Sequence, residues 1–483
     1  MTFSFPQLDQ FGTGSLVTRV TNDITQVQNF VSQFVRGMIR TSMLMFGSMY
    51  CMFRLNRDFG LIVLCAFPLI VGCLAFCMAK ANPLFSKLQA QLDSINAIMQ
   101  EDVSGIRIIK ACVREFYEKA RFGKANDALI KTQLRVLVIF AFMNPVINAL
   151  MYIVVAIILL AGSFEVGSGG TTPGSIMAAI TYTTQLLNGI LMLVMLFQNI
   201  SRGIASWKRV KEVLHSQPEL KDGAFDGKTE KHGEIEFRDV SFSYPGSSQM
   251  VLEHVNLTVH QGETLAIMGA TGCGKSSLVN LIPRFYDASS GAVLVDGVDV
   301  REYRQKELRK KISSVLQKSE LFSTTIQENI AWGAPDAAIQ AIQAAAVTAQ
   351  ADDFIRGTPD GYDTIVAERG MSLSGGQKQR SSIARAVLKP AEILIFDDST
   401  SALDLKTEAN FYAALQKANP QSTKILIAQR IASVRRADRI VVLENGRIAA
   451  CGSHEELLKS CGAYQDIYHS QIGEGEESHE RAQ

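Results

Sequence analysis

Two long runs without a charged residue constrain the fold of this 483-residue chain more than any other feature of its sequence. Phe59–Ala79 contains 21 uncharged residues and Val136–Phe164 contains 29, and a helix of about 20 apolar residues can cross a bilayer. Ser175–Phe197 forms a third run, and Arg36–Arg54 forms a weaker fourth. A buried core helix would explain any single run. Four runs predict a helical membrane domain with spans near residues 36–54, 59–79, 136–163 and 175–197.

Basic residues predict the orientation of these spans. Residues 80–135 contain ten lysines and arginines, whereas the segment between the last two spans contains none. Because cytoplasmic loops of membrane proteins are enriched in Lys and Arg, we expect residues 80–135 in the cytoplasm, with residues 1–35 on the same side. The apolar spacing within 80–135 predicts helices that project from the membrane. The predicted membrane domain is residues 1–214.

A change in composition marks a second domain. Residues 215–233 are polar and rich in Gly, Lys and Asp, which predicts a linker. Residues 234–472 have the pattern of a soluble α/β domain, and residues 473–483 predict a disordered tail. The net charge of +1 argues against a nucleic-acid partner. The eight scattered cysteines include no CxxC pair, which argues against a zinc site or a disulfide framework.

The sequence GATGCGKSS in the second domain fits the phosphate-binding pattern G-x-x-x-x-G-K-[ST]. It follows an apolar stretch, TLAIM, and precedes SLVNLIPRF, so we predict the strand, loop and helix that the motif requires. The glycines let backbone N–H groups converge on phosphate oxygens, while Lys275 reaches the terminal phosphates and Ser276 is a ligand for Mg²⁺. The residues predicted to bind the nucleotide here are Gly269, Ala270, Thr271, Gly272, Cys273, Gly274, Lys275, Ser276 and Ser277.

Two adjacent carboxylates end the apolar stretch ILIF in the sequence ILIFDDSTSALD. Asp397 is the acid expected to hold Mg²⁺ opposite the phosphate loop of a P-loop enzyme. A strand that ends in a single Asp is common in α/β domains, so this prediction depends on the phosphate loop earlier in the chain. Asp398 follows directly, at a position where many phosphate-splitting enzymes of this design carry Glu.

A second glycine motif, LSGGQ, opens a predicted helix, QKQRSSIARAVL. Its N–H groups form another anion site, but one nucleotide does not need two phosphate cradles on one chain. A loop that only caps the helix is the structural alternative. We favour two such domains that face each other head to tail, so that each chain's motif closes the nucleotide site of the other. The residues concerned are Ser374, Gly375, Gly376 and Gln377.

The phosphate loop, LSGGQ and SALD together resemble the nucleotide-binding domain of an ABC transporter. A membrane domain followed by this domain on one chain is similar to the half-transporters of the multidrug-export group, and the resemblance covers nearly the whole sequence. It implies an all-α membrane domain followed by an α/β P-loop NTPase domain with a helical subdomain. It also implies ATP and Mg²⁺ as cofactors, and ATP hydrolysis coupled to transport.

The resemblance further implies partners and a location. A second half-transporter would complete the machine, and membrane lipid would surround its spans. The transported substrate would be a small molecule, a lipid or a peptide. The plasma (inner) membrane is the expected location, with the nucleotide-binding domain in the cytoplasm. The family has six spans in each half whereas this sequence predicts four, so we expect the first two spans to be absent.

Single residues take expected roles from the same resemblance. Tyr244 resembles the aromatic residue that stacks on adenine, although a lone tyrosine could equally belong to the core. Gln317 matches the glutamine that senses Mg²⁺ and contacts the membrane domain, so it joins Ser276 and Asp397 as a metal residue and is also expected to act in catalysis. The sequence SALD, at residues 401–404, matches the loop that crosses to the partner's site.

Two departures from the exporter pattern concern catalysis. The family has Glu where this chain has Asp398, and His where this chain has Gln429 in LIAQR. Asp is shorter than Glu by about one C–C bond, ~1.5 Å, and Gln can neither carry a charge nor relay a proton. Together the two changes resemble the degenerate site of a heterodimeric exporter. A homodimer with slow hydrolysis at both sites, and a non-transporting membrane ATPase regulator, are the alternatives.

Overall fold

The computed structural model describes residues 3–216, 218 and 220–480 and divides the chain into two compact units. One unit is Gly14–His215, and the other combines Met1–Thr13 with Ser216–Gln483. The predicted membrane domain, residues 1–214, therefore differs from the first unit at its start, because residues 1–13 group with the second unit.

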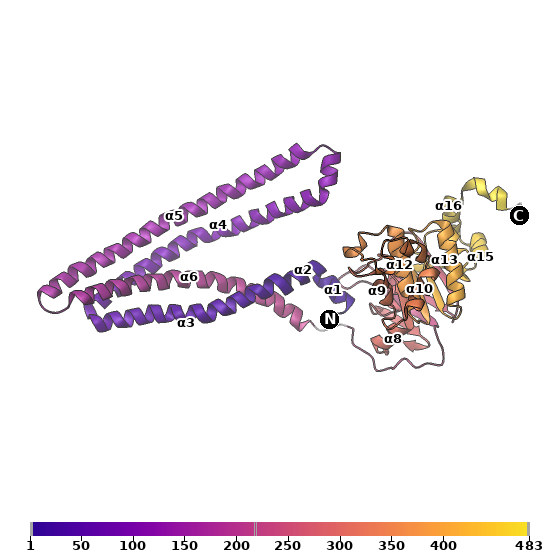
Figure 1. Ribbon diagram of the computed structural model, residues 1–483, viewed down its shortest axis with the longest axis horizontal. Helices are drawn as coiled ribbons and strands as arrows, with labels where there is room; N and C mark the ends of the chain where they lie inside the picture. The colour runs from indigo at the N-terminus through magenta and orange to yellow at the C-terminus, as the bar shows by residue number, and fades with distance from the viewer. Residues whose placement is uncertain (1–2, 217, 219, 481–483) are drawn as a thin grey trace. The chain divides into compact units, whose positions relative to one another are not determined.

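Long helices make up most of the first unit. After α2 (Thr13–Thr18) and a short π-helix (Arg19–Asp23), the chain forms α3 (Ile24–Leu55), α4 (Arg57–Ala111), α5 (Glu115–Gly167) and α6 (Pro173–His215). Helix α3 packs along α6, and α4 packs along α5 (Figure 1). Each helix is much longer than the span predicted within it, because the same helix continues into the neighbouring segment that was predicted to lie outside the membrane.

The number of spans predicted from the sequence is only partly supported. In the described residues, α4 and α5 are long and apolar enough to cross a membrane. Helix α3 contains 32 residues but is not among the helices that meet this test. Helix α6 contains 43 residues, and part of its predicted span lies outside the residues that were described for this test. In α3 the arginines Arg36, Arg40 and Arg54 lower the hydropathy. The count of four spans therefore stays a prediction.

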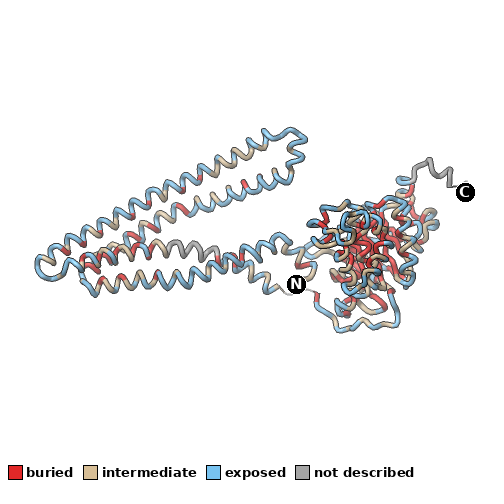
Figure 2. The backbone as a smooth tube through the Cα atoms, in the orientation of Figure 1, coloured by how far each residue is buried: buried red, intermediate tan, exposed pale blue. Residues whose placement is uncertain are grey.

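Apolar side chains cover much of the surface of these helices, and few of their residues are buried (Figure 2). The side chains of Phe76 and Phe142 are 66% and 71% exposed. Such a surface suits lipid, because a helix satisfies its own backbone hydrogen bonds and hydrocarbon accepts apolar side chains. Among the described contacts between α3 and α6, Ser48 Oγ donates to Gln185 Oε1 at 3.2 Å, as polar residues do between helices in membranes.

Two sheets organise the second unit within the described residues. The larger sheet has the strand order β10-β9-β3-β8-β7-β6, in which β10 is antiparallel to β9 and all other neighbours are parallel. The smaller sheet is antiparallel, with the order β2-β1-β4-β5. The strands are β1 (Ile235–Phe242), β2 (Leu252–Val259), β3 (Thr264–Met268), β4 (Ser290–Val295), β5 (Val298–Asp299), β6 (Ile312–Val315), β7 (Ile393–Asp397), β8 (Thr423–Ile427), β9 (Arg439–Glu444) and β10 (Arg447–Gly452).

Strand β7 shows why the larger sheet lies inside the unit. Side chains alternate between the two faces of a strand. Ile393 and Ile395 pack into the core shared with the smaller sheet, whereas Leu394 and Phe396 pack into the core beneath the helical subdomain. A strand buried on both faces is apolar along its length, and the first polar residue of β7, Asp397, comes at its end, still paired with Ile427 of β8. Parallel strands bring their carboxyl ends to one edge, where ligands bind in open α/β sheets.

Helices cover both faces of the larger sheet, and most buried residues of the molecule lie in this unit (Figure 2). The helices are α7 (Lys275–Leu281), α8 (Gln305–Lys311), α9 (Ile326–Ala331), α10 (Ile339–Thr348), α11 (Asp352–Arg356), α12 (Gly375–Leu388), α13 (Leu405–Ala418), α14 (Ile431–Val434), α15 (His454–Ser460) and α16 (Gly462–Glu480), with 3₁₀ turns at Gly361–Asp363 and Glu368–Gly370. Helices α9 to α13 share one apolar core and form the predicted helical subdomain.

Both ends of the second unit differ from expectation. At the start, α1 (Phe5–Phe11) packs on this unit: the Phe5 ring lies 4.4 Å from that of Phe285, and the Tyr286 hydroxyl donates to Asp9 at 2.5 Å. At the other end, α16 extends through residues 473–480, where we predicted disorder. Helix growth adds one hydrogen bond per residue, and Glu is a good helix former. Residues 481–483 lie outside the described part of the chain.

Candidate functional site

The phosphate loop has the predicted context, because it joins the end of β3 to the start of α7. Two of its glycines are required by their surroundings. Gly269 has φ +149°, and a Cβ there would lie 2.2 Å from the Leu443 carbonyl oxygen. Gly274 has φ +102°, and a Cβ there would lie 2.9 Å from the Val251 carbonyl oxygen. The loop can therefore pass close to β9 and β2 only with glycine at both positions.

The two residues that follow the loop have fixed polar partners. Lys275 Nζ donates to the carbonyl oxygens of Gly269 and Ala270, each at 2.8 Å. Ser276 Oγ donates to Asp397 Oδ1 at 3.0 Å. The first contact holds the ammonium at the rim of the loop, and the second brings the end of β7 to the start of α7. The binding of Mg²⁺ by Ser276 and Asp397 stays a prediction.

A cavity of about 360 Å³ collects most of the predicted site residues. The phosphate loop supplies one wall and the ends of β7 and β8 supply another. Of the residues predicted in the phosphate loop, Gly269, Ala270 and Cys273 do not line it; the Cys273 side chain is buried instead. The lining residues are Tyr244, Val251, Thr271, Gly272, Gly274, Lys275, Ser276, Ser277, Gln317, Asp397, Asp398, Ile427 and Gln429.

Two side-chain amides hydrogen-bond to Asp398, the second of the two adjacent acids. Gln429 Nε2 donates to Asp398 Oδ2 at 2.9 Å, and Gln317 also hydrogen-bonds to this carboxylate. Asp398 itself has φ +48°, a left-handed conformation that is uncommon outside glycine, although Asp adopts it more readily than most residues. Burial raises the pKa of the Asp398 carboxyl, and the two amides partly offset this rise. The three side chains thus form one connected group at the end of the sheet.

Burial also raises the pKa of Asp397, and the negative charge of Asp398 acts in the same direction. The hydrogen bond from Ser276 and the positive charge of Lys275 oppose this rise. A divalent cation between these groups would relieve the repulsion between the two carboxylates, because it favours their charged forms.

The donor set fits Mg²⁺ bound together with a nucleotide. Ser276, Asp397 and Gln317 offer a hydroxyl, a carboxylate and an amide oxygen on the same cavity. Mg²⁺ prefers oxygen ligands and is held in such sites by one or two carboxylates together with phosphate oxygens. Among the described residues there is no cluster of three or more His, Cys, Asp or Glu that would hold a metal by itself.

Tyr244 lies beside the phosphate loop. Its hydroxyl lies 2.9 Å from Ser277 Oγ, and its ring packs edge-on against Tyr286 and Phe242, with centroids 5.2 and 4.9 Å away. The ring is half-buried and lines the cavity. Tyr244 thus packs against the core and also lines the site, so its role in stacking on adenine stays a prediction.

The LSGGQ motif forms a helix start with an internal cap. The Ser374 side chain accepts from the Gln377 amide at 3.3 Å, and Gln377 Oε1 accepts from the Ser374 amide at 2.8 Å. A Cβ on Gly376 would lie 3.1 Å from the Ala402 carbonyl oxygen, so this glycine allows the close approach of the SALD loop. Ser374 and Gly375 are exposed, and no residue of the motif lines the cavity around Lys275.

Two contacts around the site were missed in the sequence. Arg430, next to Gln429, donates to the carbonyl oxygens of Ser401 and Leu403 at 3.2 and 3.0 Å, which joins the two loops. Because Arg430 directly follows Gln429 in LIAQR, the sequence could have indicated that it lies near the site. Gln471 on α16 donates to the Gln429 carbonyl at 2.6 Å. No local pattern marks Gln471, because its partner is distant in sequence.

Comparison with known proteins identifies the family. Residues 1–190 match the ABC transporter transmembrane region, and residues 252–401 match the ABC transporter family. An ABC transporter ATP-binding protein of Bacillus subtilis (strain 168), YfiB, described as uncharacterized, is 40% identical over 99% of this chain and 83% of its own length. This chain belongs to the ABC transporter family. It is a half-transporter of the exporter kind, a membrane protein in which ATP hydrolysis by the second unit is coupled to transport.

Further similarities agree with this membership. The ATP-dependent lipid A-core flippase of Syntrophus aciditrophicus (strain SB) is 36% identical to this chain, over 96% of this chain and 77% of the flippase. The solved structure of a bacterial Atm1-family ABC exporter with ATP bound matches with a TM-score of 0.81 and 28% identity, over 98% of this chain and 83% of that one. The sequence prediction of an ABC exporter half-transporter is therefore confirmed.

Proposed function

We propose that this chain is one half of a heterodimeric exporter in which its own site binds ATP but hydrolyses it slowly. The observation that carries the proposal is the contact between Gln429 Nε2 and Asp398 Oδ2, at 2.9 Å. These are the two positions at which the exporter pattern has Glu and His. In this chain the Gln429 amide donates to the Asp398 carboxylate, and both side chains line the cavity that contains Lys275.

Two physical effects make Asp398 a poor base for the attacking water. Its carboxylate reaches about one C–C bond less far than a glutamate would, ~1.5 Å, and a misplacement of about 1 Å can cost roughly 100-fold in rate. It also accepts hydrogen bonds from Gln429 and Gln317, and these occupy lone pairs that would otherwise orient water. Gln429 can donate a hydrogen bond to phosphate but cannot carry a proton away.

The residues for nucleotide binding are complete. The loop amides and Lys275 would hold the phosphates, and Tyr244 would lie against the base. Ser276, Asp397 and Gln317 would hold Mg²⁺, which neutralises phosphate charge when it is bound. Binding without efficient hydrolysis would favour a nucleotide that stays in place over several cycles of the partner's site.

The LSGGQ motif would serve the partner. Ser374 and Gly376 would meet the nucleotide of the opposite chain, because the motif is exposed and separate from the chain's own cavity. The partner would then carry the catalytic Glu and His. The division into a membrane domain at 1–214, a linker at 215–233 and a nucleotide-binding domain at 234–472 remains part of the proposal, as does a place in the plasma (inner) membrane.

The substrate class is a lipid or another amphipathic molecule. The support is the printed function of relatives: proteins 35–37% identical to this chain from Syntrophus aciditrophicus, Chromohalobacter salexigens and Desulfotalea psychrophila are named ATP-dependent lipid A-core flippases. The apolar surfaces of α4 and α5 suit movement of such a substrate alongside the membrane. Vesicles with a fluorescent lipid would test this class, because a flippase moves the probe between leaflets only with ATP.

The dimer is tested by comparing the chain purified alone with the chain purified together with its partner. We expect the chain alone to bind ATP and hydrolyse it slowly, and the complex to hydrolyse it much faster. A chain that hydrolyses ATP alone as fast as any complex would support the homodimer and contradict the proposal.

A further inference from the structure

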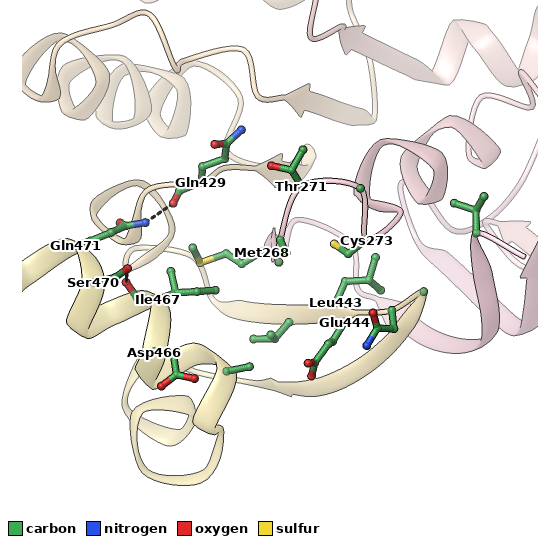
Figure 3. Close-up of a pocket in the computed structure, with 18 of the residues that line it drawn as sticks. Met268, Thr271, Cys273, Gln429, Leu443, Glu444, Asp466, Ile467, Ser470 and Gln471 are labelled. Atoms are coloured by element: carbon green, nitrogen blue, oxygen red, sulfur yellow. Dashed lines mark hydrogen bonds between the residues drawn. The ribbon is translucent and has the colours of Figure 1, made fainter.

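The C-terminal helix α16 contacts the turn that carries Gln429. Gln471 Nε2 donates to the Gln429 carbonyl oxygen at 2.6 Å, and Gln471 Oε1 accepts from the Ile431 amide at 2.8 Å. Figure 3 shows the first of these contacts at the edge of a second cavity, of about 740 Å³, beside the phosphate loop. A single side-chain amide therefore binds both ends of the turn from Gln429 to Ile431.

This turn depends on Gln471 for its cap. Helix α14 begins at Ile431, and the side chain of its N-cap residue, Arg430, makes no capping hydrogen bond. The first N–H groups of a helix have no partner within the helix, so Gln471 supplies one from outside. Arg430 is extended, with φ −99° and ψ 131°, and its guanidinium donates to the SALD loop instead.

Helix α16, which carries Gln471, is held in place by buried apolar contacts. Tyr464 is fully buried and Tyr468 is nearly so, and both pack in one apolar cluster with Ile431 and Val434 of α14. Residues 464, 468 and 471 follow the i, i+4, i+7 spacing of one helix face. Apolar burial therefore fixes the helix, and the Gln471 amide is carried to the turn in a defined place.

We propose that Gln471 is a positioning residue that sets where the Gln429 side chain meets Asp398 and the terminal phosphate of ATP. The hydrogen bonds form a series from α16 to the site: Gln471 to the Gln429 backbone, then the Gln429 side chain to Asp398. A loss of the first contact frees the turn and with it the amide of Gln429. The inference rests on the proposed placement of Gln429 at the nucleotide.

A double-mutant cycle tests this role. Gln471→Ala is made in the native chain and in the Gln429→Ala chain, and ATP affinity is measured on the full transporter with the partner's phosphate-loop lysine replaced. We expect about fivefold weaker binding in the native background, the worth of one hydrogen bond, and less than twofold in the Gln429→Ala background. Equal losses in both backgrounds would mean a cap for α14 alone and overturn the inference, as would no loss in either.

The variant Gln471→Glu adds a pH signature. Its carboxylate can accept from the Ile431 amide, but it places a negative oxygen against the Gln429 carbonyl oxygen. Protonation restores a donor, and the carbonyl raises the pKa of the introduced carboxyl because it disfavours the charged form. ATP affinity relative to the native chain should fall at pH 7.5 and recover as the pH is lowered towards 5.5. A ratio that does not change with pH contradicts the proposal.

The neighbour Ser470 provides the matched control. It lines the same cavity, and its hydroxyl donates to the Ile467 carbonyl oxygen within α16. Ser470→Ala should leave ATP affinity unchanged. The cycle also separates this inference from the dimer proposal. If the chain forms a homodimer, the phosphate-loop lysine is kept in both copies and ATP titrates two equivalent sites. The effect of Gln471→Ala can then still be compared between the native and Gln429→Ala chains.

Discussion

The two walls of the cavity around Lys275 differ in how far their residues match the exporter pattern. On the phosphate-loop wall, Lys275 and Ser276 line the cavity, and Ser276 Oγ donates to Asp397 Oδ1 at 3.0 Å. On the opposite wall, Asp398 and Gln429 contact each other where an efficient exporter site needs a longer acid and a histidine. In the proposed function, the first wall binds the nucleotide and the second activates water poorly.

Under the proposed function, ATP binding and ATP hydrolysis are separated within one cavity. Phosphate binding depends on backbone N–H groups and one ammonium, which tolerate small shifts of the opposite wall. Water activation depends on the placement of one carboxylate, and effects of residues that act together on one transition state are not additive. A site can therefore lose hydrolysis while its affinity for ATP remains.

The largest expected effect is on the ATPase rate, and it compares a change in the LSGGQ motif with a change at Asp398. In the full complex, Ser374→Ala should lower ATP hydrolysis by roughly 100-fold, the usual cost of one donor to the reacting group, because it weakens the partner's productive site. Asp398→Asn should change the rate less than twofold. The measurement is the steady-state ATPase rate, with Ser372→Ala, two residues earlier, as control. Similar losses from Ser374→Ala and Asp398→Asn would contradict the division of labour.

The next effect tests the binding wall. Lys275→Ala should weaken ATP binding at this site by roughly 10- to 100-fold, because hydrogen bonds to charged groups contribute about 1.5–3 kcal/mol. Calorimetric titration of the transporter measures it. Lys310→Ala, which removes an exposed lysine paired with Glu307 on α8, is the control. Equal ATP affinities in the native and Lys275→Ala proteins would contradict the proposal that the phosphate-loop wall binds ATP.

Placing Glu and His at positions 398 and 429, as in the exporter pattern, should have an intermediate effect on ATP hydrolysis. With the partner's catalytic glutamate replaced, the pair Asp398→Glu and Gln429→His should raise residual hydrolysis about tenfold, or about 1.4 kcal/mol of barrier. Each change alone should do little, because both act on one transition state. A flat rate in the double variant, with a competent motif on the partner, would mean that other residues silence the site.

The smallest effect concerns stability. The raised pKa of Asp398 means that its charged form costs stability in the folded protein above that pKa. Asp398→Asn should therefore raise the Tm of the second unit by roughly 1–2 °C at pH 7. The gain should shrink as the pH falls through the raised pKa and vanish below the ordinary value for Asp, where the carboxyl is protonated in both states. Calorimetry with exposed Asp336→Asn as control measures it, and a gain that grows on acidification refutes it.

Local patterns explain what the sequence could predict. The phosphate loop, the acid that ends β7 and the capped start of α12 each lie within a few consecutive residues, so turn chemistry and hydrophobic spacing identify them. Contacts between distant segments were missed. Phe5 packs on Phe285, and Gln471 binds the Gln429 turn, but nothing beside either residue indicates its partner.

The span count shows a second limit of sequence patterns. Hydropathy separates α4 and α5 from soluble helices, but α3 mixes apolar residues with arginines. Its length follows from the structure, because Ile24–Leu55 continues as one helix through polar and apolar stretches alike. Composition alone does not report where such a helix meets lipid.

A rapid-quench experiment tests the central claim most directly. The complex is prepared with the partner's phosphate-loop lysine replaced, so that labelled ATP binds only at the Lys275 site, and the nucleotide retained on the protein is identified over time. The account predicts that it remains ATP long after the native complex has completed many turnovers. Conversion to ADP at the turnover rate of the native complex would show that Asp398 and Gln429 form a working hydrolytic pair.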